Sequence, residues 1–393
     1  MKLDETAFRR GISMALLWSW FLGWEFMLGF AGSVWPQPNK VTDLPAQRVT
    51  LVGQLTLQEA LRQLEELAPD PNNHLADLRA AFGQRADNPK LALELRDVSF
   101  WQACDELAQQ AGLRVVLLPA NAERGVLVGL LTPATRKPLP KPPVCYTGPF
   151  RVRIVEVQAW YNLDDPDLSR LELTTEWACE PRYLPLWLHT TPESVRWQGA
   201  DKTEHAARQA GQGTIKWLGE AALRWRLQLP LPPRQLPSLP FLKLQATALI
   251  APKRLTFQVS PLSAGQTCRS DDVLVTLRSA DYDAPNGQWR LQLHLDYPRA
   301  DGPRGFDLES YHTWIMDASR FWLQAQGQNR RVTPGRPVTV SIEGRHAFQL
   351  ELVFSAPEQN RPAESPLWAL HGIIPATPLA VPIRASFRDI PLP

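Results

Sequence analysis

Alternation of apolar and polar residues with a period of two dominates the chain from residue 147 to its end. It is clearest in four segments in which one strand face is apolar and the other polar: 171–179, 223–229, 289–297 and 348–354. One buried and one solvated face are typical of antiparallel strands in sheets that pack as sandwiches. Between two such segments, Asn286 and Gly287 predict a tight hairpin turn.

Proline content supports this interpretation. The chain has 37 prolines in 393 residues, and proline is excluded from helix interiors and central strands. We expect two antiparallel β-sandwich-like domains, at about 147–261 and 268–393. A Pro- and Lys-rich stretch, "TPATRKPLPKPP", predicts a linker over 132–146.

The region before the linker has a different pattern, in which a strand followed by a helix occurs twice. "RVTLVGQLTLQEALRQLEELA" begins at residue 48 and "LALELRDVSFWQACDELA" at residue 91. Both helices start with an S/T-x-x-E/Q capping box and carry apolar residues at i, i+3, i+4 and i+7. Gly112 predicts the end of the second helix, "LRVVLL" a following strand, and 74–82 a further short helix. The fold class we expect is therefore a small α+β N-terminal module at 46–131 followed by a mainly β chain.

These motifs also resemble known proteins. The two strand–helix units are similar to the secretin/TonB short N-terminal domain, a small β-α module near the N-termini of secretins and TonB-dependent receptors. More of the chain resembles exported, functionally uncharacterised multidomain proteins of planctomycete-type bacteria, through "TGPFRVRIVEV", "EWACEPRYLPL" and "SFRDIPLP". The module's resemblance implies protein–protein docking. The sequence shows neither the secretin pore domain nor the long receptor barrel that accompany the module in those families.

The first 35 residues look like a targeting segment. Arg9 and Arg10 precede a long apolar run, and Ala31 and Ser33 fit a small-residue cleavage pattern. Glu25 interrupts the run, whose length approaches that of a membrane span. A cleaved signal peptide and an uncleaved membrane anchor both remain open, beside a cytosolic apolar helix. The first two place the remainder in the periplasm or outside the cell, with membrane contact only through this segment.

The residue pattern disfavours several kinds of chemistry. No G-x-S-x-G elbow, phosphate-binding loop or CxxC pair is present, and the seven histidines are scattered. His294 lies on the polar face of a strand, where we expect solvent. The net charge of +2 gives no reason to expect nucleic acid as a partner. We predict no catalytic residues, no metal site and no cofactor.

The acidic turn "NLDDPDLS" at 162–169 has three aspartates, Asp164, Asp165 and Asp167. A calcium site or an acid pair for glycoside hydrolysis would use such residues. The spacing does not match an EF-hand loop, and Asp and Pro are ordinary turn residues. The interpretation we favour is a solvated turn.

Tryptophan is unusually frequent, with 15 residues. Alternation points Trp177, Trp225 and Trp289 into the core. It leaves seven others unassigned: Trp160, Trp187, Trp197, Trp217, Trp314, Trp322 and Trp368. A row of these on one exposed sheet face would bind carbohydrate, whereas the simpler interpretation is that they fill the core.

The cysteines pose a similar choice. Cys104 stands between acidic neighbours, but the repeat places it where the first unit has Leu61, on the apolar helix face. We therefore interpret it as a packing residue rather than a reactive thiol. Cys145 and Cys179 are the candidate disulfide pair for an oxidising compartment, and two buried free thiols are the alternative.

Together these features predict a non-enzymatic, extracytoplasmic interaction or scaffold protein that binds a protein or an envelope component. A carbohydrate-binding protein is the first alternative, and a hydrolase whose site residues are far apart in sequence is the second.

Overall fold

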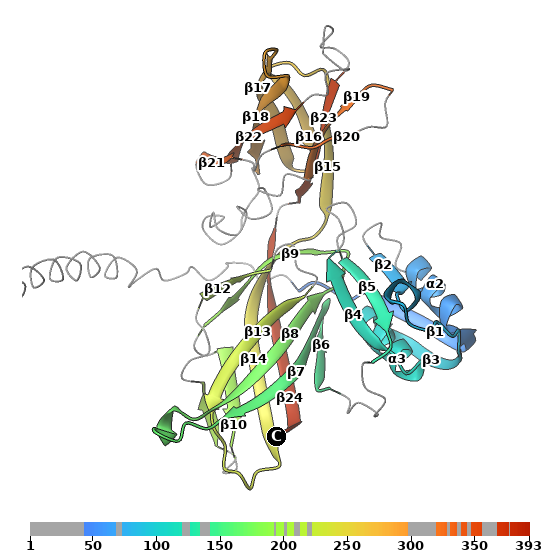
Figure 1. The fold of residues 1–393 in the computed structure, drawn as a ribbon, viewed down its shortest axis with the longest axis vertical. Helices are drawn as coiled ribbons and strands as arrows, with labels where there is room; N and C mark the ends of the chain where they lie inside the picture. The colour runs from blue at the N-terminus through green and yellow to red at the C-terminus, as the bar shows by residue number, and fades with distance from the viewer. Residues whose placement is uncertain are drawn as a thin grey trace, which may run out of the picture. The chain divides into compact units, whose positions relative to one another are not determined.

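A computed structural model represents the whole chain (Figure 1). The residues that it describes are 43–67, 73–119, 126–133, 142–191, 194–199, 203–207, 213–217, 222–297, 320–327, 331–335, 339–343, 347–355, 368–376 and 378–393. The expected targeting segment at 1–35 lies outside them. Within them the chain is mainly β, as predicted, with 24 strands in several sheets and two α-helices.

The N-terminal elements share one hydrophobic core and follow the predicted repeat. They are β1 (Arg48–Thr56), α2 (Leu57–Leu67), β2 (Asn73–Asp77), η1 (Ala80–Phe82), β3 (Lys90–Ser99), α3 (Phe100–Gln110), β4 (Arg114–Pro119) and β5 (Val126–Leu131). Strands β1 and β3 form an antiparallel pair, and β2, β5 and β4 form a second sheet. The segment 74–82, predicted as a helix, is instead most of β2, up to Asp77, followed by the 3₁₀ turn η1.

Both predicted capping boxes are present. The Ser99 hydroxyl accepts a hydrogen bond from the Gln102 N–H, and the Gln102 side chain accepts one from the Ser99 N–H. Thr56 and Glu59 make the same reciprocal contacts at the start of α2. The predicted apolar faces are buried in both helices, and Gly112 follows α3 with a positive φ of 66°.

The middle of the chain forms two sheets that share a second core. In chain order the elements are β6 (Val144–Thr147), β7 (Phe150–Trp160), η2 (Pro166–Leu168), β8 (Arg170–Cys179), β9 (Leu184–Thr190), β10 (Val195–Gln198), β11 (Glu204–Ala206), β12 (Gly213–Lys216), β13 (Leu223–Pro230) and β14 (Ser238–Ala251). One sheet has the order β13-β8-β7-β6 and the other β11-β10-β14-β9-β12. The expected linker therefore ends in a strand, since β6 begins at Val144.

The last part of the chain, apart from its final strand, lines a third core. Its elements are β15 (Arg254–Val259), β16 (Gln266–Ser270), β17 (Val273–Asp283), β18 (Gln288–Asp296), β19 (Phe321–Ala325), β20 (Arg331–Val332), β21 (Thr339–Glu343), β22 (Ala347–Ser355), β23 (Trp368–Pro375) and β24 (Leu379–Pro391). One sheet has the order β15-β23-β19-β20 and the other β16-β17-β18-β22-β21. The predicted hairpin at Asn286 and Gly287 joins β17 to β18.

The final strand does not stay with its neighbours in sequence. β24 lies beside β14 in Figure 1. The two strands pair antiparallel over twelve register positions, and the apolar face of β24 lines the second core. The expected range 268–393 thus contributes its end to the core of the expected range 147–261. The alternation in 379–391 specifies a strand with one apolar face, but it does not specify which sheet receives that strand.

The predicted polar face of β8 is only partly solvated. Thr174 and Glu176 are both 6% exposed although they lie opposite the apolar face. On this face Glu176 pairs with Arg153 and Arg151, the Arg151 side chain is itself held by Asp105 of α3, and Ala178 joins the N-terminal core. Alternation in the sequence shows which strand face is polar, but it does not show whether other parts of the chain cover that face.

The pairing of β24 with β14 is testable through Phe387, which is buried in the shared core opposite Leu242. We expect Phe387→Ala to lower the free energy of unfolding by about 3–5 kcal/mol, because it leaves a cavity. The neighbouring Arg388→Ala, at an exposed position, is the matched control and should change it by less than about 0.5 kcal/mol. Urea unfolding followed by tryptophan fluorescence measures both variants. Equal unfolding midpoints for the two variants would contradict the placement of β24 in the second core.

Candidate interaction surface

The end of the β7–β8 hairpin gathers exposed apolar side chains. Eight large hydrophobic residues are exposed among those that the structure describes. Four of them lie in this turn, within the nine residues 160–168. They are Trp160 (50% exposed), Tyr161 (46%), Leu163 (90%) and Leu168 (59%). Single exposed apolar residues are common, whereas large contiguous apolar patches mark interaction sites, so this cluster is our candidate interaction surface. We call residues 160–170 the hairpin tip.

The tip is held in shape by its own polar groups. The Asn162 side-chain oxygen accepts hydrogen bonds of 3.0 Å from the backbone N–H groups of Asp164 and Asp165. The Ser169 hydroxyl accepts a bond of 3.0 Å from the Asn162 N–H, which closes the loop at its base. These bonds fix the backbone on both sides of Leu163, so its exposed side chain is presented from an ordered turn.

Two arginines lie over the aromatic rings of the tip. The guanidinium carbon of Arg170, directly across the strand pair from Trp160, is 5.7 Å from the centroid of that ring. Arg234, from the loop between β13 and β14, lies 4.7 Å from the centroid of the Tyr161 ring. Each such cation–π contact contributes about 0.5–1 kcal/mol at an exposed site and restrains the ring. Trp, Tyr and Arg are also the residues enriched at the energetic centres of protein interfaces.

The three aspartates of the tip are exposed. The Asp165 carboxylate accepts a hydrogen bond of 3.2 Å from the Asp167 N–H and so caps the short η2 turn. Within the described ranges, no group of three His, Cys, Asp or Glu side chains is placed to hold a metal ion. The geometry supports a solvated turn and gives no support to the calcium site.

Most of the unassigned tryptophans fill the cores. Trp177, Trp225 and Trp289 are buried as predicted. Of the seven left open, Trp160 is half exposed, Trp314 lies outside the described residues, and five are buried: Trp187, Trp197, Trp217, Trp322 and Trp368. The described residues therefore form no exposed row of indole rings, which is the feature that the carbohydrate alternative expected.

The sequence singled out Trp160 and the aspartates but missed the tip as a surface. The missing members are Tyr161, Leu163 and Leu168, together with the two stacked arginines. The available signal was the occurrence of three large apolar residues inside a turn rich in Asn, Asp and Pro. His294, expected in solvent, is half-buried and lies 3.0 Å from Arg278 through its Nδ1.

The cysteines are free thiols. Cys145 lies on β6 and Cys179 on β8, with β7 between them in the sheet. Strands two positions apart are separated by roughly 10 Å, beyond the roughly 7 Å that a disulfide allows between Cα atoms. The candidate pair is therefore not joined. Cys104 is fully buried, and burial, reinforced by Asp105, raises its thiol pKa well above the usual range, as expected for a packing residue.

Alkylation tests this assignment. With iodoacetamide on the native protein, we expect Cys104 and Cys179 to stay unlabelled while the partly exposed Cys145 reacts, because burial raises the pKa of both buried thiols. In urea without reductant, all four cysteines should be alkylated. Peptide mass spectrometry measures both, and a disulfide-linked peptide containing Cys145 and Cys179 would contradict the structure.

An ion pair between the buried Arg151 and the partly buried Asp105 joins α3 to the β7–β8 sheet. Arg151 is 3% exposed and makes a two-pronged contact with Asp105, with N–O distances of 2.6 and 2.8 Å. Its guanidinium carbon lies 5.7 Å from the centroid of the Trp101 ring. The Tyr146 hydroxyl donates a 2.7 Å bond to the same carboxylate, and burial together with Asp105 raises the tyrosine pKa. These contacts attach the N-terminal core to the sheet that carries the tip.

A second set of contacts does the same at the N-terminal end. The buried Glu180 carboxylate accepts bonds of 2.9 Å from the Gln47 N–H and 2.7 Å from the Arg182 side chain. Arg182 also donates to the Pro45 carbonyl at 2.7 Å. Burial raises the pKa of Glu180, and the positive charge of Arg182 opposes this shift.

A cavity of about 500 Å³ lies beside these contacts and is lined in part by Arg48, Ser99, Gln102 and Tyr146. All four side chains are already engaged within the protein. Arg48 donates to the Asp97 carbonyl, Ser99 and Gln102 form the capping box, and Tyr146 binds Asp105. A ligand would have to displace these bonds, so the cavity offers no prepared polar site.

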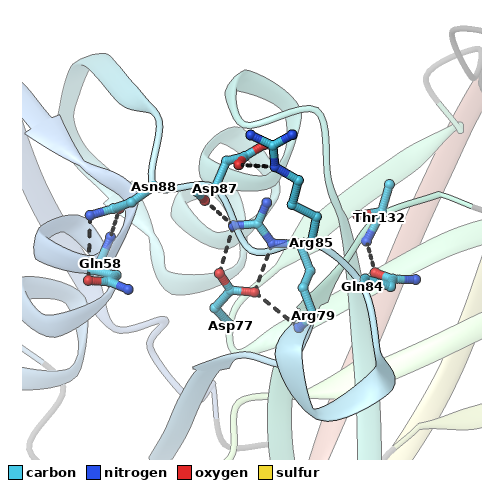
Figure 2. A network of polar contacts seen from close by, with 8 residues as sticks. All are labelled: Gln58, Asp77, Arg79, Gln84, Arg85, Asp87, Asn88 and Thr132. Carbon is cyan, nitrogen blue, oxygen red and sulfur yellow. Dashed lines mark hydrogen bonds and ion pairs between the residues drawn. The ribbon is translucent and has the colours of Figure 1, made fainter.

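A separate polar network organises the segment between β2 and β3 (Figure 2). Arg79 is 4% exposed and contacts both carboxylate oxygens of Asp77, at 2.9 and 2.7 Å. These bonds hold the pKa of Asp77 below its usual range. Further hydrogen bonds tie the segment to its surroundings: Arg79 to the Asp87 carbonyl, Gln58 with Asn88, and Gln84 with Thr132. Each charged side chain of this network has a partner in the same chain, Arg79 with Asp77 and Arg85 with Asp87. This pairing indicates a structural role.

Arg151→Met tests the importance of the buried ion pair. The change leaves the Asp105 carboxylate without its cation, and we expect a loss of about 3–5 kcal/mol in the free energy of unfolding. Arg62→Ala is the control, because the Arg62–Glu66 pair has side chains 65% and 60% exposed and should contribute less than about 0.5 kcal/mol. Urea unfolding measures both, and equal losses would contradict a buried, coupled pair.

In the described part of the chain, no helix combines the length and apolar character needed to cross a membrane. The chain matches no protein-family model, no curated protein and no solved structure.

Proposed function

We propose that this chain is a non-enzymatic, extracytoplasmic interaction or scaffold protein of the cell envelope. Its tip, Trp160 to Arg170, would be the surface that binds a protein partner. The observation that carries the proposal is the 90% exposure of Leu163 on a turn held by internal hydrogen bonds. An ordered exposed leucine loses little conformational freedom on binding, which favours recognition.

The architecture suits a scaffold. We propose that the first core is an α+β module of the secretin/TonB short N-terminal domain type, and that the other two are β-sandwich-like domains. Buried contacts of Arg151 and Glu180 tie the module to the β sheets. A scaffold needs such coupling, because it presents a binding surface in a defined position relative to the rest of the chain.

The extracytoplasmic location rests on the sequence of the first 35 residues, read as a signal peptide or an anchor. The resemblance to planctomycete-type exported proteins points the same way. The export of the chain and its kinship with those proteins are both parts of the proposal. They predict that the protein is recovered with the envelope or outside the cell when source cells are fractionated.

Assembly of the full chain tests the function. A tagged chain purified from the envelope of its source cells should elute in size-exclusion chromatography with a stoichiometric partner protein. We expect Leu163→Ser/Leu168→Ser to elute alone, because it removes apolar contact area from the tip.

The matched control is Leu67→Ser/Phe82→Ser. Leu67 and Phe82 are apolar residues outside the tip and are 45% and 55% exposed. This variant should retain the partner. A wild-type chain that elutes only as a monomer would refute the proposed function.

A further inference from the structure

We infer that the hairpin tip inserts Leu163 into an apolar pocket of a partner protein whose rim carries Lys or Arg. The inference rests on the proposed function and specifies the chemistry of the partner. It depends on the arrangement of apolar, aromatic and charged groups within residues 160–170, with Arg234.

The apolar part of the tip fits a concave site. Leu163 is 90% exposed at the turn, with Trp160, Tyr161 and Leu168 exposed around it. A protruding side chain gains most from burial when the opposite surface surrounds it, as anchor residues do at interface centres. The stacked arginines restrain the two rings beside it. The tip is therefore a preformed protrusion, and its complement is a pocket.

The charges of the tip indicate what surrounds that pocket. Asp164, Asp165 and Asp167 are exposed next to Leu163, whereas the two positive charges lie over the aromatic rings. Asp165 uses one carboxylate oxygen within the turn. Among the residues that the structure describes, no hydrogen bond or ion pair engages the carboxylates of Asp164 and Asp167. Interfaces match charge to charge across the rim, so three carboxylates around an apolar centre favour a basic partner rim.

The same charges disfavour other occupants. Insertion of Leu163 into a lipid bilayer would bring the neighbouring carboxylates into it as well. The free-energy cost of burying these charges rises with the depth of insertion, and anionic headgroups would repel them. A sugar would use the aromatic rings but would gain nothing from Leu163 and Leu168. The combination of aliphatic, aromatic and acidic groups is accounted for by a protein partner.

Photo-crosslinking of the full chain tests the inference. We would incorporate p-benzoylphenylalanine in place of Leu163, add the purified protein to envelope fractions of the source cells, irradiate, and sequence the crosslinked peptides. The control carries the same probe in place of Phe82, an exposed residue in η1. We expect an adduct from position 163 only, in a partner peptide that combines apolar residues with Lys or Arg.

Charge gives the second readout. We expect the adduct yield to fall several-fold with added salt and in Asp164→Asn/Asp167→Asn, which preserves the hydrogen bonds of Asp165. Adducts to lipid or to a second copy of this chain would overturn the inference. So would a partner peptide without basic residues, or a yield that does not respond to charge.

Failure of the inference and failure of the proposed function are distinguishable. A protein adduct only from position 82, or one from position 163 that is insensitive to charge, would leave an interaction protein with a different docking chemistry. Absence of protein adducts at both positions, in a chain that also elutes as a monomer, would refute both.

Discussion

The rest of the β structure depends on the pairing of β14 with β24. β14 is the longest strand among the described residues, with 14 residues. It pairs with β10 and β9 along one edge and with β24 along the other. Leu242, Leu244 and Ile250 face the second core, whereas Leu249 and Ala251 join the third. One strand therefore contributes to two cores. Without β24 its edge would expose a row of unpaired N–H and C=O groups, and a wall of the second core would be missing.

The tip takes its position from this framework. β7 and β8 pair along their whole length up to Trp160 and Arg170, and their inward residues pack in the second core. Arg234 lies on the loop that leads into β14, so its place over Tyr161 is fixed at one end by that strand. The internal hydrogen bonds of Asn162 and Ser169 complete the turn. The exposed apolar side chains of the tip are thus held by strands that pack in the second core and by hydrogen bonds within the turn, which is the arrangement expected of a docking surface.

Local features of the fold could be predicted from the sequence, and non-local ones could not. Period-two alternation identified four strands, at 171–179, 223–229, 289–297 and 348–354, and the Ser99–Gln102 and Thr56–Glu59 pairs identified the helix starts, because these signals lie within a few residues. The return of β24 to β14 joins segments far apart in the chain, and the burial of Glu176 depends on a layer supplied by the N-terminal region. The candidate site follows the same rule. Trp160 and the aspartates stood out by residue type, but only the fold shows that Leu163 is exposed and that Arg234 reaches Tyr161.

Hydrogen–deuterium exchange of the tip tests the central claim, that this exposed turn is ordered before any partner binds. The backbone N–H groups of Asp164, Asp165, Asp167, Leu168 and Ser169 all have acceptors inside the turn. Mass spectrometry of peptides covering 161–169 in the free, native protein would report their exchange. The account predicts exchange slower than in the same peptide from the urea-unfolded chain, once intrinsic rates are corrected for. Exchange at the unfolded rate would show that the tip is not preformed and would contradict it.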